Sequence, residues 1–350
     1  MLAAETKAVG FSVIATPPLE SPPSWKRIVE PVEPFLRAVA ERLAEQVEDF
    51  EPEIAAYARY ALTSQGKQLR PALVALSAES TGGLNDNLVT AATIIEMVHL
   101  ATLVHDDVMD EAQIRRRRPT LAAHSGNTIS VLVGDCLFAH ALKLAAGFPT
   151  PDVCRAVATA TKTVCSGEIL QNQRQHQFHI VRAEYFRVLR MKTGELFALS
   201  CDLGAWLSGT TGTERAALRE YGMALGTAYQ IYDDCLDLFG SEAIAGKSLG
   251  TDVAGGKLTL PLIVTMERAS LSDRKSLETM LLRWDQRMLP RLLALLERYE
   301  ALDESRGVIR DFCASARQSL KVLPSTDGRQ ALAEIADFLA QQTNALGVGS

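Results

Sequence analysis

The most chemically suggestive stretch is LVHDDVMDEAQIRRRRPT, residues 103–120, which holds an acidic block followed by a basic one. The acidic block contains Asp106, Asp107 and Asp110, and the basic block runs from 115 to 118. Helices on a protein surface usually alternate their charges so that neighbours pair, so a sorted pattern is unusual. The arginines could form a nucleic-acid patch, but their acidic neighbours and the net charge of −6 argue against binding of nucleic acid.

A second acidic cluster, YQIYDDCLD at residues 229–237, repeats the spacing of the first. On a helix, Asp233 and Asp237 lie one turn apart on one face, with Asp234 beside them. Each cluster ends a run of apolar residues at helical spacing, which predicts that both lie at the rim of the core. One such cluster alone is commonly a solvated helix face, whereas two in this setting indicate a shared site.

Two clusters of carboxylates at one site need cations, since charges about 4 Å apart repel by roughly 4 kcal/mol at an effective dielectric of 20. Carboxylate oxygens favour a hard ion such as Mg²⁺, which keeps waters and shares its coordination sphere with substrate phosphates. Arginine side chains grip phosphate oxygens in a bidentate way. We therefore predict that a diphosphate bridges the two acidic clusters through Mg²⁺.

The elements that must position these residues are predicted to be helices. The chain has 350 residues and 47% hydrophobic content, which is enough for a sizeable core. Two apolar stripes at helical spacing lead into the acidic clusters: Ala91, Ile94, Ile95 and Val98, and Leu218, Tyr221, Leu225 and Tyr229. Thr211 and Glu214 fit a capping box for the second of these helices. Residues 127–146 contain a β-branched run, but a helix is expected there because no other segment would pair with it as a sheet.

These patterns predict one all-α domain over residues 25–342, between a disordered tail at 1–24 and a short tail at 343–350. Six cysteines are scattered singly, which is typical of reduced thiols in a cytoplasmic protein. No run approaches the roughly 20 apolar residues that a membrane span needs. We therefore expect a cytoplasmic chain without integral membrane association.

Seven stretches together resemble the trans-isoprenyl diphosphate synthases, the polyprenyl synthetase family, from about residue 30 to residue 341. They are GKQLRP (66–71), HDDVMDEAQIRRRRPT (105–120), VLVGD (131–135), GEILQ (167–171), MKTGELF (191–197), YQIYDDCLD (229–237) and GTDVAGGKLTLPLI (250–263). Each is modest alone, but their order and spacing are specific. The resemblance implies an isoprenoid-synthase-type helical bundle around a deep central cavity, and a homodimer.

The resemblance also assigns roles to single residues. It implies that Asp106, Asp110 and Asp233 are the main ligands of three Mg²⁺ ions, supported directly or through water by Asp107, Asp234 and Asp237. It places the allylic diphosphate on Arg115, Lys192, Lys247 and Lys257, and isopentenyl diphosphate on Lys67, Arg70, His99 and Arg116. Thr193 and Gln230 would line the reacting centre. One departure is Arg117, which stands where the family usually has glycine.

The implied reaction is head-to-tail condensation of isopentenyl diphosphate with an allylic diphosphate, either farnesyl or geranylgeranyl diphosphate. The allylic C–O bond ionises, the double bond of isopentenyl diphosphate attacks the cation, and proton loss gives a chain one isoprene longer. Alternatives are a synthase with a shorter product, a class I terpene cyclase, a head-to-head synthase, and a non-catalytic subunit of a heteromeric synthase. GKQLRP, Arg116 and His99 supply a second diphosphate site that a cyclase would not need. A non-catalytic subunit would be expected to lack one acidic cluster.

Product length is predicted from the residues one helical turn below the first acidic cluster. Here they are Ala101 and Thr102, both small, where shorter-chain members of the family tend to carry an aromatic residue. Val98 and Ile95 do not close the channel further down, and Phe138 is predicted to be a deeper floor. An all-trans product of roughly six to ten isoprene units is expected, because one helical turn of about 5.4 Å matches one extended unit. The other reading is that small residues here only permit helix packing.

Overall fold

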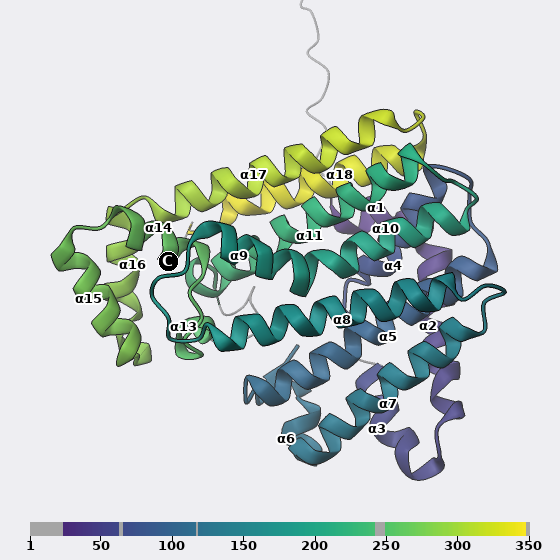
Figure 1. The fold of residues 1–350 in the computed structure, drawn as a ribbon, viewed down its shortest axis with the longest axis horizontal. Coiled ribbons are helices and arrows are strands. Elements are labelled where there is room, and N and C mark those ends of the chain that lie inside the picture. The colour runs from purple at the N-terminus through teal and green to yellow at the C-terminus, as the bar shows by residue number, and fades with distance from the viewer. Residues whose placement is uncertain (1–23, 63–65, 117, 242–248, 348–350) are drawn as a thin grey trace, which may run out of the picture.

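The computed structural model describes residues 24–62, 66–116, 118–241 and 249–347. These residues form a helical bundle with one short two-stranded hairpin, as the sequence predicts (Figure 1). The predicted tail at 1–24 lies outside the described residues except for Ser24, which caps the first helix. At the other end, a short 3-10 helix continues past residue 342, and Leu346 is buried.

The first half of the chain contains α1 (Trp25–Val29), η1 (Glu30–Val32), α2 (Glu33–Glu45), η2 (Gln46–Asp49), α3 (Pro52–Leu62), α4 (Leu69–Glu79), α5 (Asp86–Met109), β1 (Ile114–Arg115), β2 (Arg118–Pro119), α6 (Leu121–Ser125), α7 (Asn127–Ala146) and α8 (Asp152–Gln173). The second half contains α9 (Arg182–Leu189), η3 (Arg190–Gly194), α10 (Glu195–Leu207), α11 (Thr213–Phe239), α13 (Thr251–Ala254), α14 (Leu260–Arg268), α15 (Leu271–Leu282), η4 (Gln286–Met288), α16 (Leu289–Arg298), α17 (Ala301–Ser319), η5 (Leu320–Val322), α18 (Asp327–Gln342) and η6 (Thr343–Ala345).

The core is built around α10 and α11, which pack along each other and against α4 and α17 (Figure 1). α5 packs against α7 on one side and α4 on the other. The core side chains are mostly aliphatic, with Tyr221 and Phe197 as its largest fully buried members. α14, α15 and α16 form a separate group at the left end of the bundle in Figure 1.

Both acidic clusters lie at the C-terminal ends of long core helices. Asp110 caps the end of α5, and Asp237 lies in the last turn of α11. Carboxylates are disfavoured at this end because the helix dipole is negative there. Cations must therefore offset the charge. On electrostatic grounds the rim of the core can bind cations and, through them, phosphates.

A hairpin delivers the arginines to the same rim. β1 and β2 pair antiparallel, with Arg115 opposite Arg118, and Arg116 occupies the tight turn with a left-handed φ of 51°. The hairpin is anchored from α3, because the Tyr60 hydroxyl donates to the Pro119 carbonyl at 2.7 Å and the Arg118 guanidinium lies 3.9 Å from the centre of the Tyr60 ring. Arg117, which stands where the family usually has glycine, lies outside the described residues.

Two expectations about helices need correction. The capping box at Thr211 is wrong, because α11 begins at Thr213 after Gly212, whose φ is 71° and which makes no side-chain cap. Two helices, α5 and α7, are long and apolar enough to cross a membrane by length and composition alone, contrary to our expectation from the sequence. The apolar window of α5 is 67% buried inside the fold and that of α7 is 39% buried, and buried core helices pass the same criterion.

Candidate active site

In the first acidic cluster, one carboxylate is bonded to an arginine and the other two face the site. Asp107 is 6% exposed and accepts a hydrogen bond from Arg115 Nε at 2.6 Å. This bond uses the carboxylate to hold the arginine hairpin against α5. Burial raises the pKa of Asp106 to about 6, with Lys192 acting against the shift. A carboxyl group in this setting gains from a neighbouring cation.

The second cluster has two carboxylates that are held by protein donors. Asp237 is fully buried, and its two oxygens accept from Thr251 Oγ1 at 2.6 Å and from the Asp252 backbone N–H at 3.0 Å. It therefore holds the first turn of α13, and its support of a metal ion, directly or through water, stays a prediction. Asp234 is 6% exposed and also has both oxygens bonded, to Tyr185 and to Gln230.

The pKa of Asp234 reflects the burial of its side chain. Burial, with Asp252 and Asp233 adding to it, raises the pKa of Asp234 to about 8, while the two hydrogen bonds act in the opposite direction. A cation beside Asp233 would also favour the ionised form. Asp233 is only partly buried, and it is the member of the second cluster best placed to meet a ligand.

Lys257 links the first acidic cluster to α13. Its Nζ lies 3.0 Å from Asp110 Oδ1 at the end of α5 and 3.6 Å from Asp252 Oδ1 in α13. Burial works to lower the pKa of Lys257, but Asp252 and Asp110 raise it by more, so the group stays charged. The second cluster is close by, because the Asp252 backbone N–H is bonded to Asp237 and Lys257 lines a pocket together with Asp234.

Lys192 lies in η3, a π-helical turn between α9 and α10, and such turns often mark functional sites. Its Nζ lies 2.5 Å from Glu168 Oε2 and donates to Gln171 Oε1 at 2.8 Å. Burial works to lower the pKa of Lys192, and Asp106 and Glu168 outweigh it. Lys192 and Lys257 are thus two half-buried cations beside the acidic clusters.

Thr193 and Gln230, both predicted to line the reacting centre, lie in contact. The Thr193 hydroxyl donates to Gln230 Oε1 at 2.7 Å, and Thr193 is 6% exposed. Lys247, the remaining residue predicted for the allylic site, lies outside the described residues.

A second basic group forms around the start of α4. The Arg70 guanidinium lies 5.0 Å from the centre of the Phe197 ring, and its Nε has no hydrogen-bond partner. Burial lowers the pKa of His99 well below its ordinary value, and Arg70 and Arg116 add to the effect, so the imidazole is neutral at pH 7. Lys67 is exposed, with its Nζ 6.0 Å from the centre of the Phe338 ring.

Two further features shape this second basic group. Glu96 is 7% exposed on α5; burial raises its pKa, and Arg70 and Arg116 oppose the rise. Gly66 admits the Arg116 side chain, because a β-carbon there would lie 2.4 Å from Arg116 Nη2. The glycine of GKQLRP is therefore needed for close approach of the guanidinium.

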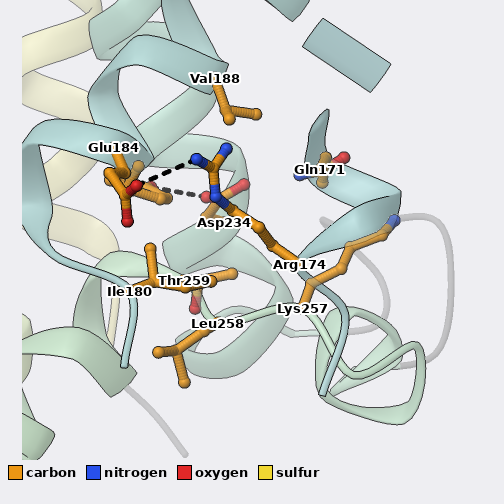
Figure 2. A pocket seen from close by; sticks show the side chains of 10 residues that line it. Gln171, Arg174, Ile180, Glu184, Val188, Asp234, Lys257, Leu258 and Thr259 are labelled. Carbon is orange, nitrogen blue, oxygen red and sulfur yellow. Dashed lines mark hydrogen bonds and ion pairs between the residues drawn. The ribbon is translucent and has the colours of Figure 1, made fainter. Parts of the chain in front are cut away.

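A pocket opens behind the second acidic cluster (Figure 2). Its empty volume is about 390 Å³, including the solvent at its mouth, and Asp234, Lys257 and Thr259 line it. Figure 2 shows Arg174 reaching across this pocket to Glu184, to which it donates at 3.1 Å. The Thr259 hydroxyl, on a residue that is 4% exposed, has no hydrogen-bond partner.

The donor set fits Mg²⁺ rather than a softer metal. The side chains of Asp106, Asp110 and Asp233 offer only oxygens, which hard cations prefer. Within the described ranges, no three His, Cys, Asp or Glu side chains gather as a ready-made metal cage. This arrangement suits an ion that takes only one or two protein carboxylates and completes its sphere with phosphates and water.

The residues predicted to set product length lie near the first acidic cluster. Ala101 is fully buried, and the Thr102 hydroxyl donates to the His99 carbonyl at 2.7 Å. Phe138, which is predicted to be a deeper floor, packs its ring against His105 with the two centroids 5.6 Å apart. The chain turns back after the hairpin, so the first half of α7 faces the end of α5.

Some site residues were not identified from the sequence. Glu168 and Gln171 are three residues apart on α8 and both hold Lys192, but the GEILQ motif alone does not indicate this role. Asp252 and Glu96 are isolated acids in the sequence, and only the fold shows that they face basic side chains. Tyr185 carries no local signal, since its partner Asp234 is 49 residues away.

Comparison with known proteins places these motifs in context. The family model described as Polyprenyl synthetase matches residues 51–293. The short chain isoprenyl diphosphate synthase of Methanothermobacter thermautotrophicus is 34% identical, with 86% of this chain and 94% of that protein covered. The geranyl-diphosphate-specific all-trans-nonaprenyl-diphosphate synthase of Rhodobacter capsulatus is 33% identical over 88% of this chain and 95% of that protein. The crystal structure of a polyprenyl synthase from Caulobacter crescentus, complexed with calcium and isoprenyl diphosphate, is similar at a TM-score of 0.86, with 33% identity over 92% of this chain and 99% of that one.

Proposed function

The chain belongs to the polyprenyl synthetase family, and from this premise we propose that it condenses isopentenyl diphosphate head-to-tail with an allylic diphosphate. The proposed starter is farnesyl or geranylgeranyl diphosphate, and the proposed product is an all-trans polyprenyl diphosphate of roughly six to ten isoprene units. The observation that carries the proposal is the presence of two separate basic groups. Lys192 and Lys257 adjoin the acidic clusters, whereas Arg70 and Arg116 gather around His99.

The proposal includes three Mg²⁺ ions, with Asp106, Asp110 and Asp233 as their main protein ligands. The ions supply charge neutralisation for the departing diphosphate when bound. The calcium in the Caulobacter crescentus structure supports a divalent ion in a relative. In this chain the support is the oxygen-only donor set at the ends of α5 and α11.

Each group of residues then has its own role in the proposed reaction. Lys192 and Lys257, with Arg115, hold the allylic diphosphate and stabilise the charge that develops as the C–O bond breaks. Thr193 and Gln230 present oxygen atoms beside the allylic cation. The aliphatic wall below Asp106 excludes water, which would otherwise quench the cation. After the new C–C bond forms, a proton leaves to the released diphosphate.

The geometry favours condensation over the other candidate functions. A class I terpene cyclase has no use for the second basic group at Arg70, His99 and Arg116. A non-catalytic subunit has no need to keep both acidic clusters, and here both are present, with Lys257 bonded to Asp110 of the first and lining a pocket with Asp234 of the second. A synthase with a shorter product remains the second candidate, because one similar relative is a short chain synthase.

The direct test is turnover by the purified chain alone. We expect it to elongate farnesyl diphosphate with isopentenyl diphosphate in the presence of Mg²⁺, measured as incorporation of labelled isopentenyl diphosphate into extractable prenyl chains. No turnover by the folded chain, with turnover restored only on adding a second protein, would identify a subunit of a heteromeric synthase instead.

Single substitutions should separate the two diphosphate sites. Arg116→Ala is expected to raise KM for isopentenyl diphosphate by about 10- to 100-fold, since it removes charge-assisted hydrogen bonds. Gly66→Ala should act in the same direction, because its new β-carbon displaces the Arg116 guanidinium. Lys192→Ala should raise KM for the allylic substrate instead. Initial rates with each substrate varied in turn measure both constants, and equal effects on both would contradict the assignment.

We also propose a homodimer in the cytoplasm without integral membrane association. Support for the dimer comes from exposed apolar side chains on two neighbouring helices, Val131 and Leu132 on α7 and Ile169 on α8. Burying such side chains between subunits is favourable by the hydrophobic effect. Sedimentation velocity at micromolar concentration should show one species of twice the chain mass, and a monomer would count against the dimer.

A further inference from the structure

A chain of three hydrogen bonds connects the reacting centre to a tyrosine behind the second acidic cluster. The Thr193 hydroxyl donates to Gln230 Oε1 at 2.7 Å, and Gln230 Nε2 donates to Asp234 Oδ1 at 2.9 Å. The Tyr185 hydroxyl donates to the other carboxylate oxygen, Asp234 Oδ2, at 2.6 Å. Both oxygens of Asp234 are therefore bonded to protein donors.

Three of the four residues in this chain of hydrogen bonds are buried, and Gln230 is half-buried. Tyr185, Asp234 and Thr193 are each 6% exposed. Hydrogen bonds in such surroundings are stronger than in water, and bonds in series reinforce one another. A buried network with every member bonded favours a single arrangement of its side chains.

The three bonds also join two segments of the fold at the π-helical turn. Tyr185 lies in α9 and Thr193 in η3, whereas Gln230 and Asp234 lie one turn apart on α11. The backbones are close here, because a β-carbon on Gly226 of α11 would lie 2.9 Å from Gly194 Cα in η3. The turn that presents Thr193 is thus held to α11 by close packing and by the hydrogen bonds.

We propose that Tyr185 and Asp234 are positioning residues that fix the Gln230 amide and, through it, the Thr193 hydroxyl. On this view Asp234 acts through Gln230 and does not coordinate metal directly, although it sits in the same motif as Asp233. Figure 2 shows Asp234 on the wall of the pocket, which Arg174 and Glu184 cross. The proposal rests on the proposed function, because the group being positioned is the pair beside the allylic cation.

The test compares two tyrosines at different places in the fold. Both are buried, and the hydroxyl of each donates one hydrogen bond. Tyr221 is fully buried, and its hydroxyl donates to the Leu332 carbonyl at 2.6 Å, away from the acidic clusters. Tyr185→Phe and Tyr221→Phe each remove one buried hydroxyl, so both should lower the melting temperature by a similar amount. Only Tyr185→Phe should lower kcat, by about tenfold, with KM for both substrates and the Mg²⁺ midpoint changed by less than about twofold.

A double-mutant cycle distinguishes positioning from a general structural effect. Thr193→Val removes the hydroxyl at the far end of the chain while keeping its shape. In that background Tyr185→Phe should lower kcat by less than about twofold further, since the group it positions is gone.

A repeated tenfold loss in the Thr193→Val background, or equal kcat for Tyr185→Phe and Tyr221→Phe, would overturn the inference. A shifted Mg²⁺ midpoint in Tyr185→Phe would also overturn it, by showing that Asp234 acts on the metal. Absence of turnover in the unmodified chain would instead refute the proposed function, and the inference with it.

Discussion

Replacing Asp106 or Asp233 by alanine is expected to lower kcat by about three orders of magnitude or more while the fold persists. Each residue is only partly buried and lies at the end of a helix, so its removal opens no cavity in the core. Steady-state turnover measures the loss, and circular dichroism melting confirms that the variants fold.

The metal requirement can be tested on the unmodified chain as well. Chelation by EDTA should abolish turnover, and added Mg²⁺ should restore it fully. Asp311→Ala is the matched control for the substitutions, because Asp311 is an exposed aspartate on α17 far along the chain from both clusters. Full activity in EDTA, or an Asp233→Ala enzyme as active as Asp311→Ala, would remove the basis of the metal assignment.

The sequence predicts the fold and the location of the site well, because both depend on local periodicity. Apolar stripes identify α5 and α11, and the acids that end these stripes must lie at the rim of the core. The helix over 127–146 is confirmed, since its apolar residues continue past the β-branched run. The polyprenyl synthetase assignment is confirmed by the family model.

The sequence does not predict which acids are free to meet a ligand. The two DDxxD motifs look alike, yet Asp107, Asp234 and Asp237 are each held by protein donors. Those donors lie 8, 49 and 14 residues away, so no local pattern reveals them. Contacts between helices are missed for the same reason: Phe138 is far from His105 in sequence but beside it in space, because the hairpin reverses the chain.

We expect product length to depend on the side chains of α5 that lie one or more helical turns before the first acidic cluster. Ala101 is one turn below His105 and fully buried, and Thr102 uses its hydroxyl on the His99 carbonyl. Neither side chain is long enough to block a prenyl tail at this level. Phe138 is beside His105, and the deeper level of α5 carries Val98 and Ile95, neither of them aromatic. Small or aliphatic side chains at these levels favour a long product, and one similar relative is a nonaprenyl synthase.

Ala101→Phe is therefore expected to stop elongation near fifteen or twenty carbons, because each turn of about 5.4 Å corresponds to one isoprene unit and the ring closes the first turn. The first condensations should continue at a rate close to that of the unmodified chain, since the diphosphate sites lie above the substitution. Ala101→Ser is the control: it adds one atom and should leave the product distribution unchanged. Chromatography of dephosphorylated products measures both variants. If the unmodified chain already stops at twenty carbons or fewer, the small residues at 101 and 102 serve helix packing alone, and the floor must be formed by other side chains.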